Sequence, residues 1–256
     1  MKLSFKNTQK PLMIVMVKHT RTPEEIKAEI TRGLKVGAEG FGMQLEELPR
    51  EYHSPEIIKE IFENAEGKPL YITNYKHHCN ENLSYEEIGE ELLNFIDYGA
   101  TMVDVMGDMY SKHPEELTDN EEAVRKQMDL IDKIHQKGGE VIMSSHVNKY
   151  LTPERVLEIA KEHKRRGADI SKIVAHGDTL EEQLENLKIT LMLKEKLGIP
   201  YLFLSGGQSC LMHRRLGILL GCCMSLCVCE EIEGVTDNPQ PLIWEQRAIR
   251  DELHMI

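Results

Sequence analysis

Short apolar runs alternate with longer segments of helical pattern eight times along this chain. The apolar runs have the length of buried β-strands and occupy residues 12–19, 40–45, 69–74, 102–106, 141–145, 170–175, 201–205 and 226–230. A helix between consecutive strands is the usual connection of a parallel pair. Eight strand–helix units in a chain of 256 residues are typical of a (β/α)8 barrel.

Helix boundary signals agree with this alternation. Five expected helix starts join a capping hydroxyl to early carboxylates, and they lie at Thr22, Ser54, Ser84, Thr152 and Thr179. An open doubly wound sheet would usually carry a glycine-rich turn after its first strand, whereas Lys18-His19-Thr20-Arg21 stands there. We therefore predict an α/β fold, a (β/α)8 TIM barrel, with residues 1–256 in a single domain.

Charge and apolar content argue against two classes of partner. The formal net charge is −12 and no basic patch stands out, so we expect no nucleic-acid partner. No apolar stretch approaches the length of a membrane span, so we expect no membrane partner and a cytoplasmic location. The six cysteines follow no secreted-scaffold spacing and read as reduced thiols. Cys222, Cys223 and Cys227 are expected on the seventh helix or its exit and Cys229 on the last strand, a placement that favours core thiols over a zinc site.

In a barrel of this kind, chemistry gathers at the carboxyl ends of the strands. The reactive residue types expected there are Lys18, His19, Gln44, Glu46, Glu47, Tyr75, Lys76, His77, His78, Asp104, Asp108, His146, Lys172, His176, Gln208, His213, Arg214 and Arg215. Loop residues are often polar simply because they are solvated. For His19, His77 and His78 this explanation is as good as a functional one.

His146 and Lys172 form the most informative pair on this rim. They lie on consecutive strands with one helix between them, so the strands should be parallel neighbours. Desolvation among apolar strand residues favours a neutral lysine amine, which can attack a carbonyl to form an imine. A nearby imidazole can then move protons. The alternatives are a lysine that reaches solvent from a strand edge and a rim histidine held by hydrogen bonds.

The whole chain resembles the type I 3-dehydroquinate dehydratases, which are Schiff-base-forming (β/α)8 enzymes of the shikimate pathway. The family's Ser-x-His and following Thr-Pro helix start match Ser144-Ser145-His146 and Thr152-Pro153, and its Asp-x-x-Lys-Ile matches Asp169–Ile173. After the seventh strand, the family's glycine-containing loop and Ser-Arg match Ser205-Gly206-Gly207-Gln208 and Arg214. Gly217 and Gly221 follow Arg214 at the family's offsets, and Arg215 is the competing assignment.

The resemblance implies a carbon–oxygen lyase that removes water from a hydroxylated cyclic keto acid. Lys172 would form the imine and His146 would transfer the protons, giving 3-dehydroshikimate if the family substrate is kept. Arg214 would bind the substrate carboxylate, and no metal or organic cofactor would be required. The family also implies a cytoplasmic homodimer acting in aromatic amino acid biosynthesis.

The substrate-binding positions depart from the family pattern. The family's Glu-x-Arg-x-Asp on strand two aligns with Gly42, Gln44 and Glu46, and its Thr-x-Arg on strand three aligns with Thr73-Asn74-Tyr75, with Lys76 next. Its Pro-Gly-Gln loop aligns with Asn238-Pro239-Gln240-Pro241. The candidate substrate-binding residues are therefore Arg214, Glu46, Gln240, Tyr75 and Lys76. An imine-forming dehydratase or aldolase that acts on another hydroxy-ketone is an alternative.

A second class of function stays open on the sequence. A metal-dependent TIM-barrel hydrolase could draw its ligands from His19, His77, His78, His146, His176 and Asp104. The His-x-His pair that typically anchors such centres on strand one is missing, since Lys18 occupies the nearby position. A catalytically silent binding or regulatory barrel is the third reading, and the presence of both His146 and Lys172 argues against it.

Overall fold

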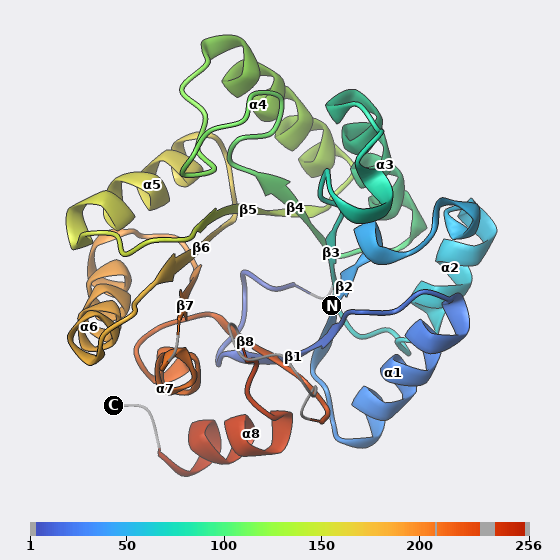
Figure 1. Ribbon diagram of the computed structural model, residues 1–256. Coiled ribbons are helices and arrows are strands. Elements are labelled where there is room, and N and C mark those ends of the chain that lie inside the picture. Colours follow the sequence, from blue (N-terminus) through green and yellow to red (C-terminus); the bar gives the residue numbers. More distant parts are fainter. Residues whose placement is uncertain (1–3, 208, 231–238, 254–256) are drawn as a thin grey trace.

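The computed structural model describes residues 4–207, 209–230 and 239–253, which form eight parallel strands and eight α-helices in alternation (Figure 1). The strands are β1 (Leu12–Val17), β2 (Gly40–Gln44), β3 (Leu70–Thr73), β4 (Met102–Met106), β5 (Glu140–Val147), β6 (Ile170–His176), β7 (Tyr201–Gly206) and β8 (Met224–Cys227). The helices are α1 (Pro23–Lys35), α2 (Pro55–Glu63), α3 (Tyr85–Tyr98), α4 (Glu121–Gln136), α5 (Pro153–Arg165), α6 (Leu180–Lys196), α7 (Cys210–Leu216) and α8 (Ile243–Glu252). The predicted (β/α)8 TIM barrel is confirmed.

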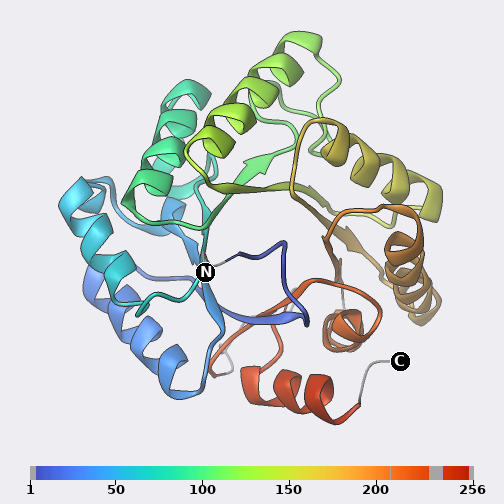
Figure 2. The same ribbon diagram turned by 180° about the vertical axis from the view of Figure 1, so that it is seen from behind.

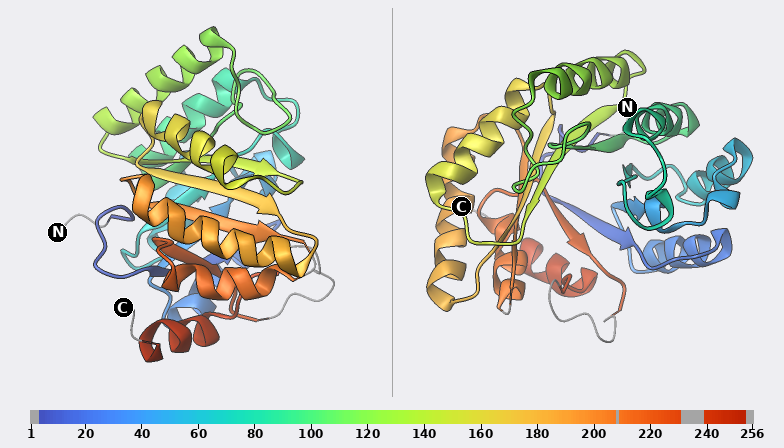
Figure 3. Two further views of the ribbon diagram at one scale, coloured as in Figure 1. Left: turned by 90° about the vertical axis from the view of Figure 1, so that its left-hand side faces the viewer. Right: turned by 45° about the horizontal axis from the view of Figure 1, so that its top comes forward.

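Hydrogen bonds join the strands in the order β7-β6-β5-β4-β3-β2-β1-β8, and within the described part of the chain β7 and β8 share no ladder. The strands run side by side in one direction, so their carboxyl ends lie together at one end of the barrel (Figure 3). The predicted parallel pairing of β5 with β6 is confirmed, with Ser144 opposite Lys172 and His146 opposite Val174. This register brings the lysine and the histidine to the same end of the barrel.

The last strand lies earlier in the chain than the sequence pattern predicted. It spans Met224–Cys227 instead of residues 226–230, because Leu12 of β1 pairs with Met224 and its backbone N–H donates to the carbonyl of Cys223. Cys227 therefore lies on β8 and not on the seventh helix or its exit, and Cys229 follows the strand. The six cysteines all lie within the described residues and form no disulfide.

The predicted helix starts are confirmed where the capping hydroxyls were expected. The side chains of Thr22, Ser54, Ser84, Thr152 and Thr179 each accept a backbone N–H from the first turn of α1, α2, α3, α5 and α6. These bonds satisfy N–H groups that have no partner within the helix. Among the described helices, none has the length and apolar character needed to cross a membrane.

Side chains fill the barrel from its amino end. One buried cluster includes inward-facing strand residues such as Ile14, Ile142 and Leu202, and a second lies between the strands and helices α1 to α4. The segment before β1 crosses the amino end of the barrel (Figure 2), where Phe5 is fully buried and its backbone N–H donates to Glu140 at 2.8 Å. The interior is therefore closed at the amino end of the barrel, and the cavity described next opens at the carboxyl end.

Candidate active site

A cavity of about 190 Å³ lies at the carboxyl end of the barrel. Every second residue of a strand faces the interior. The cavity lining follows this period with Met16 of β1 and Lys18 directly after it, and with Lys172 and Val174 of β6. The complete lining is Met16, Lys18, Gln44, Tyr71, Thr73, Tyr75, His146, Lys172, Val174, Leu204, Arg214, Leu226 and Gln240. The cavity thus joins the predicted catalytic pair with three predicted substrate-binding residues, Arg214, Tyr75 and Gln240.

The amine of Lys172 is held by three partners at the base of this cavity. Its Nζ donates to the hydroxyl oxygens of Tyr71 at 3.0 Å and Tyr75 at 2.9 Å, and to Asp104 Oδ2 at 3.2 Å. Asp104 in turn accepts hydrogen bonds from both tyrosine hydroxyls, at 2.5 and 2.6 Å, and from Ser144 Oγ at 2.5 Å. Lys172 is only 6% exposed, so its amine is fixed in position and largely shielded from solvent.

Asp104 is the charged partner of this buried lysine. Burial alone would raise the pKa of Asp104, but Lys172 and the hydroxyl donors together hold that pKa below its ordinary value. Burial first, and the Asp104 charge second, raise the pKa of Tyr71 and Tyr75 well above the ordinary value, so both phenols stay protonated. The sequence pattern predicted a lysine among apolar strand residues, without this carboxylate partner.

His146 is oriented by Glu116, which comes from the loop between β4 and α4. Glu116 Oε2 lies 2.8 Å from His146 Nδ1 and also accepts the backbone N–H of His146 at 2.7 Å. Burial opposes the effect, but these bonds and the histidine charge lower the pKa of Glu116. An ionised carboxylate can only accept, so the proton lies on Nδ1 and Nε2 is the basic nitrogen.

The loop that carries Glu116 is closed by a set of buried contacts. The backbone N–H of Thr118 donates to the carbonyl of Gly107 at 3.0 Å, and Ser145 Oγ donates to the carbonyl of Glu116 at 2.7 Å. Arg166 at the end of α5 donates to the carbonyls of Gly107 at 2.9 Å and Thr118 at 2.6 Å. Both ends of the loop are therefore fixed to the barrel.

Arg214 lies inside the cavity and Arg215 does not. Arg214 Nε donates to the carbonyl of Ser205 at 2.8 Å, and its Nη1 donates to Gln240 Oε1 at 3.0 Å. Arg215 instead pairs with Glu245 of α8 on the half-exposed outer face. Of the two competing arginines, Arg214 has the position expected of a substrate-binding residue.

Two predicted substrate-binding residues do not line the cavity. Glu46 is fully buried beside Thr73, whose hydroxyl lies 2.8 and 3.0 Å from the two carboxylate oxygens. Burial raises the pKa of Glu46 to about 7. Lys76 lies outside, with its ammonium 5.1 Å from the ring centroid of Tyr85. Both are therefore separated from Lys172 by the cavity wall.

The other rim histidines lie away from the cavity lining. The rings of His77 and His78 pack edge to face, with their centroids 4.5 Å apart. His176 faces Asp178, and His213 is buried against Thr190 and the backbone N–H of Ser205. His19 is exposed, Asp108 accepts the backbone N–H of His113, and Gln208 lies outside the described residues. Within the described part of the chain, no group of three or more His, Cys, Asp or Glu side chains is placed to hold a metal ion. The residues proposed for a hydrolase centre are thus spread over the rim.

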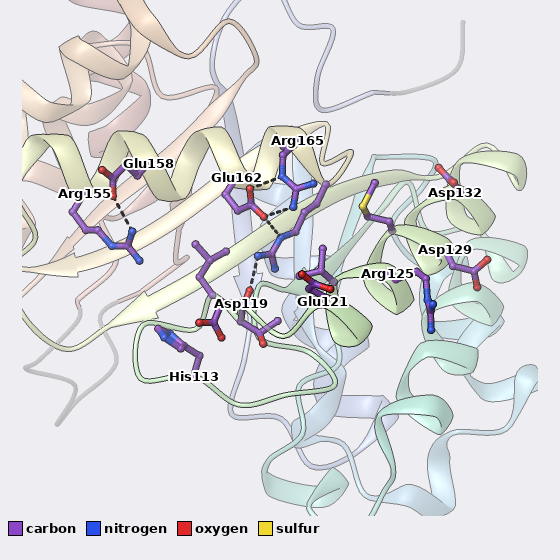
Figure 4. A pocket seen from close by; sticks show the side chains of 15 residues that line it. His113, Asp119, Glu121, Arg125, Asp129, Asp132, Arg155, Glu158, Glu162 and Arg165 are labelled. Atoms are coloured by element: carbon purple, nitrogen blue, oxygen red, sulfur yellow. Dashed lines mark hydrogen bonds and ion pairs between the residues drawn. The ribbon is translucent and has the colours of Figure 1, made fainter.

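A larger hollow is separate from this cavity. A groove of about 890 Å³ lies outside the barrel, between α4 and α5 (Figure 4). Its side chains pair with one another, as in Arg155 with Glu158 at 2.9 Å and Arg165 with Glu162 at 2.6 Å. None of the predicted catalytic or substrate-binding residues lines it.

Sequence reasoning missed the role of three residues at the site. Tyr71 follows the inward alternation of β3 but reads as a core aromatic, and Asp104 was proposed only as a rim carboxylate or metal ligand. Glu116 lies in a loop without periodicity, where no sequence signal could be found. Lys18 was expected at the end of the first strand, but no function was assigned to it.

Comparisons with known proteins agree with the geometry. A family model described as Type I 3-dehydroquinase matches residues 19–249. No curated protein matches this chain. The 3-dehydroquinate dehydratase of Geobacillus kaustophilus HTA426 superimposes with a TM-score of 0.81 and 16% identity, over 97% of this chain and 93% of that chain. The type I enzyme of Clostridium difficile, solved with covalently modified comenic acid, gives a TM-score of 0.82 and 16% identity over 97% and 94%. At this identity the two structures support the fold.

Proposed function

Because the chain belongs to the type I 3-dehydroquinase family, we propose that it is a hydro-lyase that removes water from a cyclic hydroxy-ketone through an imine on Lys172. The proposed substrate is 3-dehydroquinate and the product 3-dehydroshikimate. The observation that carries the proposal is the shared cavity in which the buried Lys172 amine and the His146 imidazole face the same 190 Å³.

The residues of the cavity supply each step. As a neutral amine, Lys172 attacks the ketone carbon. The ketone oxygen then leaves as water, taking one proton from the nitrogen and one from the imidazolium of His146, which gives a protonated imine. The imine acts as an electron sink, so Nε2 of His146 removes a proton from the adjacent carbon. The electron pair expels the hydroxyl of the next carbon, which leaves as water with the proton held by His146. Hydrolysis of the imine then returns the Lys172 amine.

Asp104, Tyr71 and Tyr75 support the first step. The carboxylate of Asp104 lies 3.2 Å from Nζ and stabilises positive charge there, both in the ammonium and in the protonated imine. The two phenols fix the direction of the amine, and their raised pKa values keep them as donors to Asp104. No metal or organic cofactor takes part in this sequence of steps.

The proposal is tested by trapping the imine. The protein is incubated with 3-dehydroquinate and sodium borohydride, and the intact mass and the digested peptides are measured. We expect a reduced adduct on Lys172 and growth of absorbance from the conjugated product. Lys172→Arg keeps a cation beside Asp104 but cannot form the imine, so it should show neither. A folded wild-type protein without adduct or turnover would contradict the assignment of 3-dehydroquinate.

Family membership also suggests a homodimer and a role in the shikimate pathway, and we propose both for this chain. Light scattering after size-exclusion chromatography tests the dimer. If 3-dehydroquinate fails, the same trap run with other hydroxy-ketones tests the alternative substrate.

A further inference from the structure

The cavity at the carboxyl end of the barrel is lined by two primary amines, those of Lys18 and Lys172. Lys172 lies on β6, whereas Lys18 directly follows β1. These two strands are not neighbours in the sheet, so the amines reach the cavity from separate parts of the barrel. The proposed function uses only the amine of Lys172, and the amine of Lys18 has no role in it.

The two amines differ in how they are held. The Nζ of Lys172 donates to two phenol oxygens and to the carboxylate of Asp104, which take the three directions open to a tetrahedral nitrogen. The Nζ of Lys18 has no hydrogen bond or ion pair with any residue that the structure describes. A carbonyl compound that reaches Lys18 therefore displaces no partner, whereas one that reaches Lys172 must first break a hydrogen bond.

The surroundings of Lys18 favour its neutral form. The residue is half-buried, and burial lowers its pKa because the charged form loses hydration. The positive charge of Arg214 lowers the pKa further, while the carboxylate of Glu47 has a smaller, opposite effect. Glu47 is also engaged elsewhere, since it accepts the backbone N–H of His19. A neutral amine has the electron pair that attacks a carbonyl carbon.

The space next to this amine is small and partly apolar. The cavity has a volume of about 190 Å³, and the buried side chains of Met16, Leu204 and Leu226 form part of its wall. Apolar walls keep water away from an imine and so slow its hydrolysis. The space suits a short-chain aldehyde, whose carbonyl carbon is also less shielded than that of a ketone.

We propose that Lys18 is a second carbonyl-reactive amine in this cavity and captures short-chain aldehydes as imines. The Nζ electron pair forms a bond to the aldehyde carbon, and the carbonyl oxygen leaves as water with both amine protons. Addition of water reverses the reaction, so no oxidant, reductant or cofactor is consumed. The captured aldehyde occupies space that Lys18 shares with Lys172. This capture is independent of the proposed function, because it needs only Lys18 and its surroundings.

Reductive labelling of the native protein tests this capture. The protein is incubated near pH 7 with a limiting amount of propanal and sodium cyanoborohydride, which reduces the imine to a propylamine. Peptide mapping then measures the label on each lysine. Lys18 should be labelled at least about tenfold faster than Lys68, an exposed lysine before β3. Lys18→Arg should lose the fast label, whereas Lys172→Arg should keep it.

Unfolding provides the control for the role of the cavity. In concentrated urea the surroundings of Lys18 are lost, so Lys18 and Lys68 should be labelled at similar rates. Labelling of native Lys18 no faster than Lys68, a fast label on Lys172 in its place, or a lead of Lys18 that persists in urea would overturn the capture.

The outcomes separate this capture from the proposed function. Fast labelling of Lys18 in a protein that forms no adduct with 3-dehydroquinate supports the capture and contradicts only the proposed substrate. An adduct of 3-dehydroquinate on Lys172, together with slow labelling of Lys18, overturns only the capture.

Discussion

Glu116 holds His146 at two points, the backbone N–H at 2.7 Å and the imidazole Nδ1 at 2.8 Å. The same residue has a left-handed backbone with φ of 46°, a conformation that is uncommon for a residue with a side chain. The surrounding contacts therefore maintain a conformation that the isolated loop would rarely adopt. This relationship fixes both the place and the tautomer of the proposed base.

Replacing Glu116 by Gln should lower kcat about 10²-fold, because an amide cannot stabilise the imidazolium and can favour the wrong tautomer. KM should change little, since Glu116 does not line the cavity. Steady-state kinetics with 3-dehydroquinate measures both constants. The matched control is Glu115→Gln, because Glu115 pairs with Lys149 and Arg155 instead of the histidine. Wild-type kcat in Glu116→Gln would contradict the orienting role.

Gly107 provides a second way to displace Glu116. A Cβ at Gly107 would lie 2.4 Å from the carbonyl oxygen of Glu116, so Gly107→Ala must push the loop backbone away. We expect kcat to fall by a similar factor, while borohydride still traps an adduct on Lys172. Peptide mapping of the trapped protein measures the adduct. Loss of both the adduct and the turnover would instead indicate that the whole cavity has collapsed.

The ion pair of Lys172 and Asp104 should show strong coupling in stability. Both side chains are buried, so Lys172→Met leaves an unpaired carboxylate and should cost about 3 to 5 kcal/mol of unfolding free energy. Asp104→Asn leaves the ammonium unpaired and should also destabilise the protein. The double variant removes both charges and should be more stable than the sum of the single losses predicts. Urea unfolding of the four proteins measures the coupling, and strictly additive losses would contradict it.

The sequence predicts the elements that bring the catalytic pair together, because this part depends on local periodicity. The alternation on β5 directs Ser144 and His146 inward, and Ser145 toward His163 of α5 at 3.0 Å. Eight such strands can satisfy their hydrogen bonds as a barrel, and the pair then meets at its carboxyl end. The fold and the position of Lys172 follow from this pattern.

The partners of the pair could not be predicted in the same way. The cage around Lys172 combines Tyr71 and Tyr75 near β3 with Asp104 of β4, and their convergence depends on register between strands. The family's carboxylate on strand two is replaced by Gly42, where a Cβ would lie 2.3 Å from Met16 Sδ. Met16 of the neighbouring strand therefore occupies the space that a side chain at position 42 would need, and this contact between strands is not visible in either segment alone.

Glu46 makes the stability of the protein depend on pH. Burial raises its pKa from the ordinary value of 4.5 to about 7. Between these two pH values the native state binds a proton that the unfolded chain has released, so unfolding stability falls as pH rises. The contribution of Glu46 is fully present below pH 4.5 and is lost as pH rises through about 7.

Glu46→Gln should remove this dependence, because an amide does not titrate. The difference in unfolding free energy between variant and wild type should shift by about 2 to 3 kcal/mol in favour of the variant between pH 5 and pH 8. Urea unfolding at several pH values, followed by circular dichroism, measures the two curves. Activity at pH 5 should change little, since Glu46 does not line the cavity. Parallel curves for the two proteins would show that the buried carboxyl does not titrate in this range. A KM that is lower for the wild type than for Glu46→Gln would indicate that Glu46 binds the substrate.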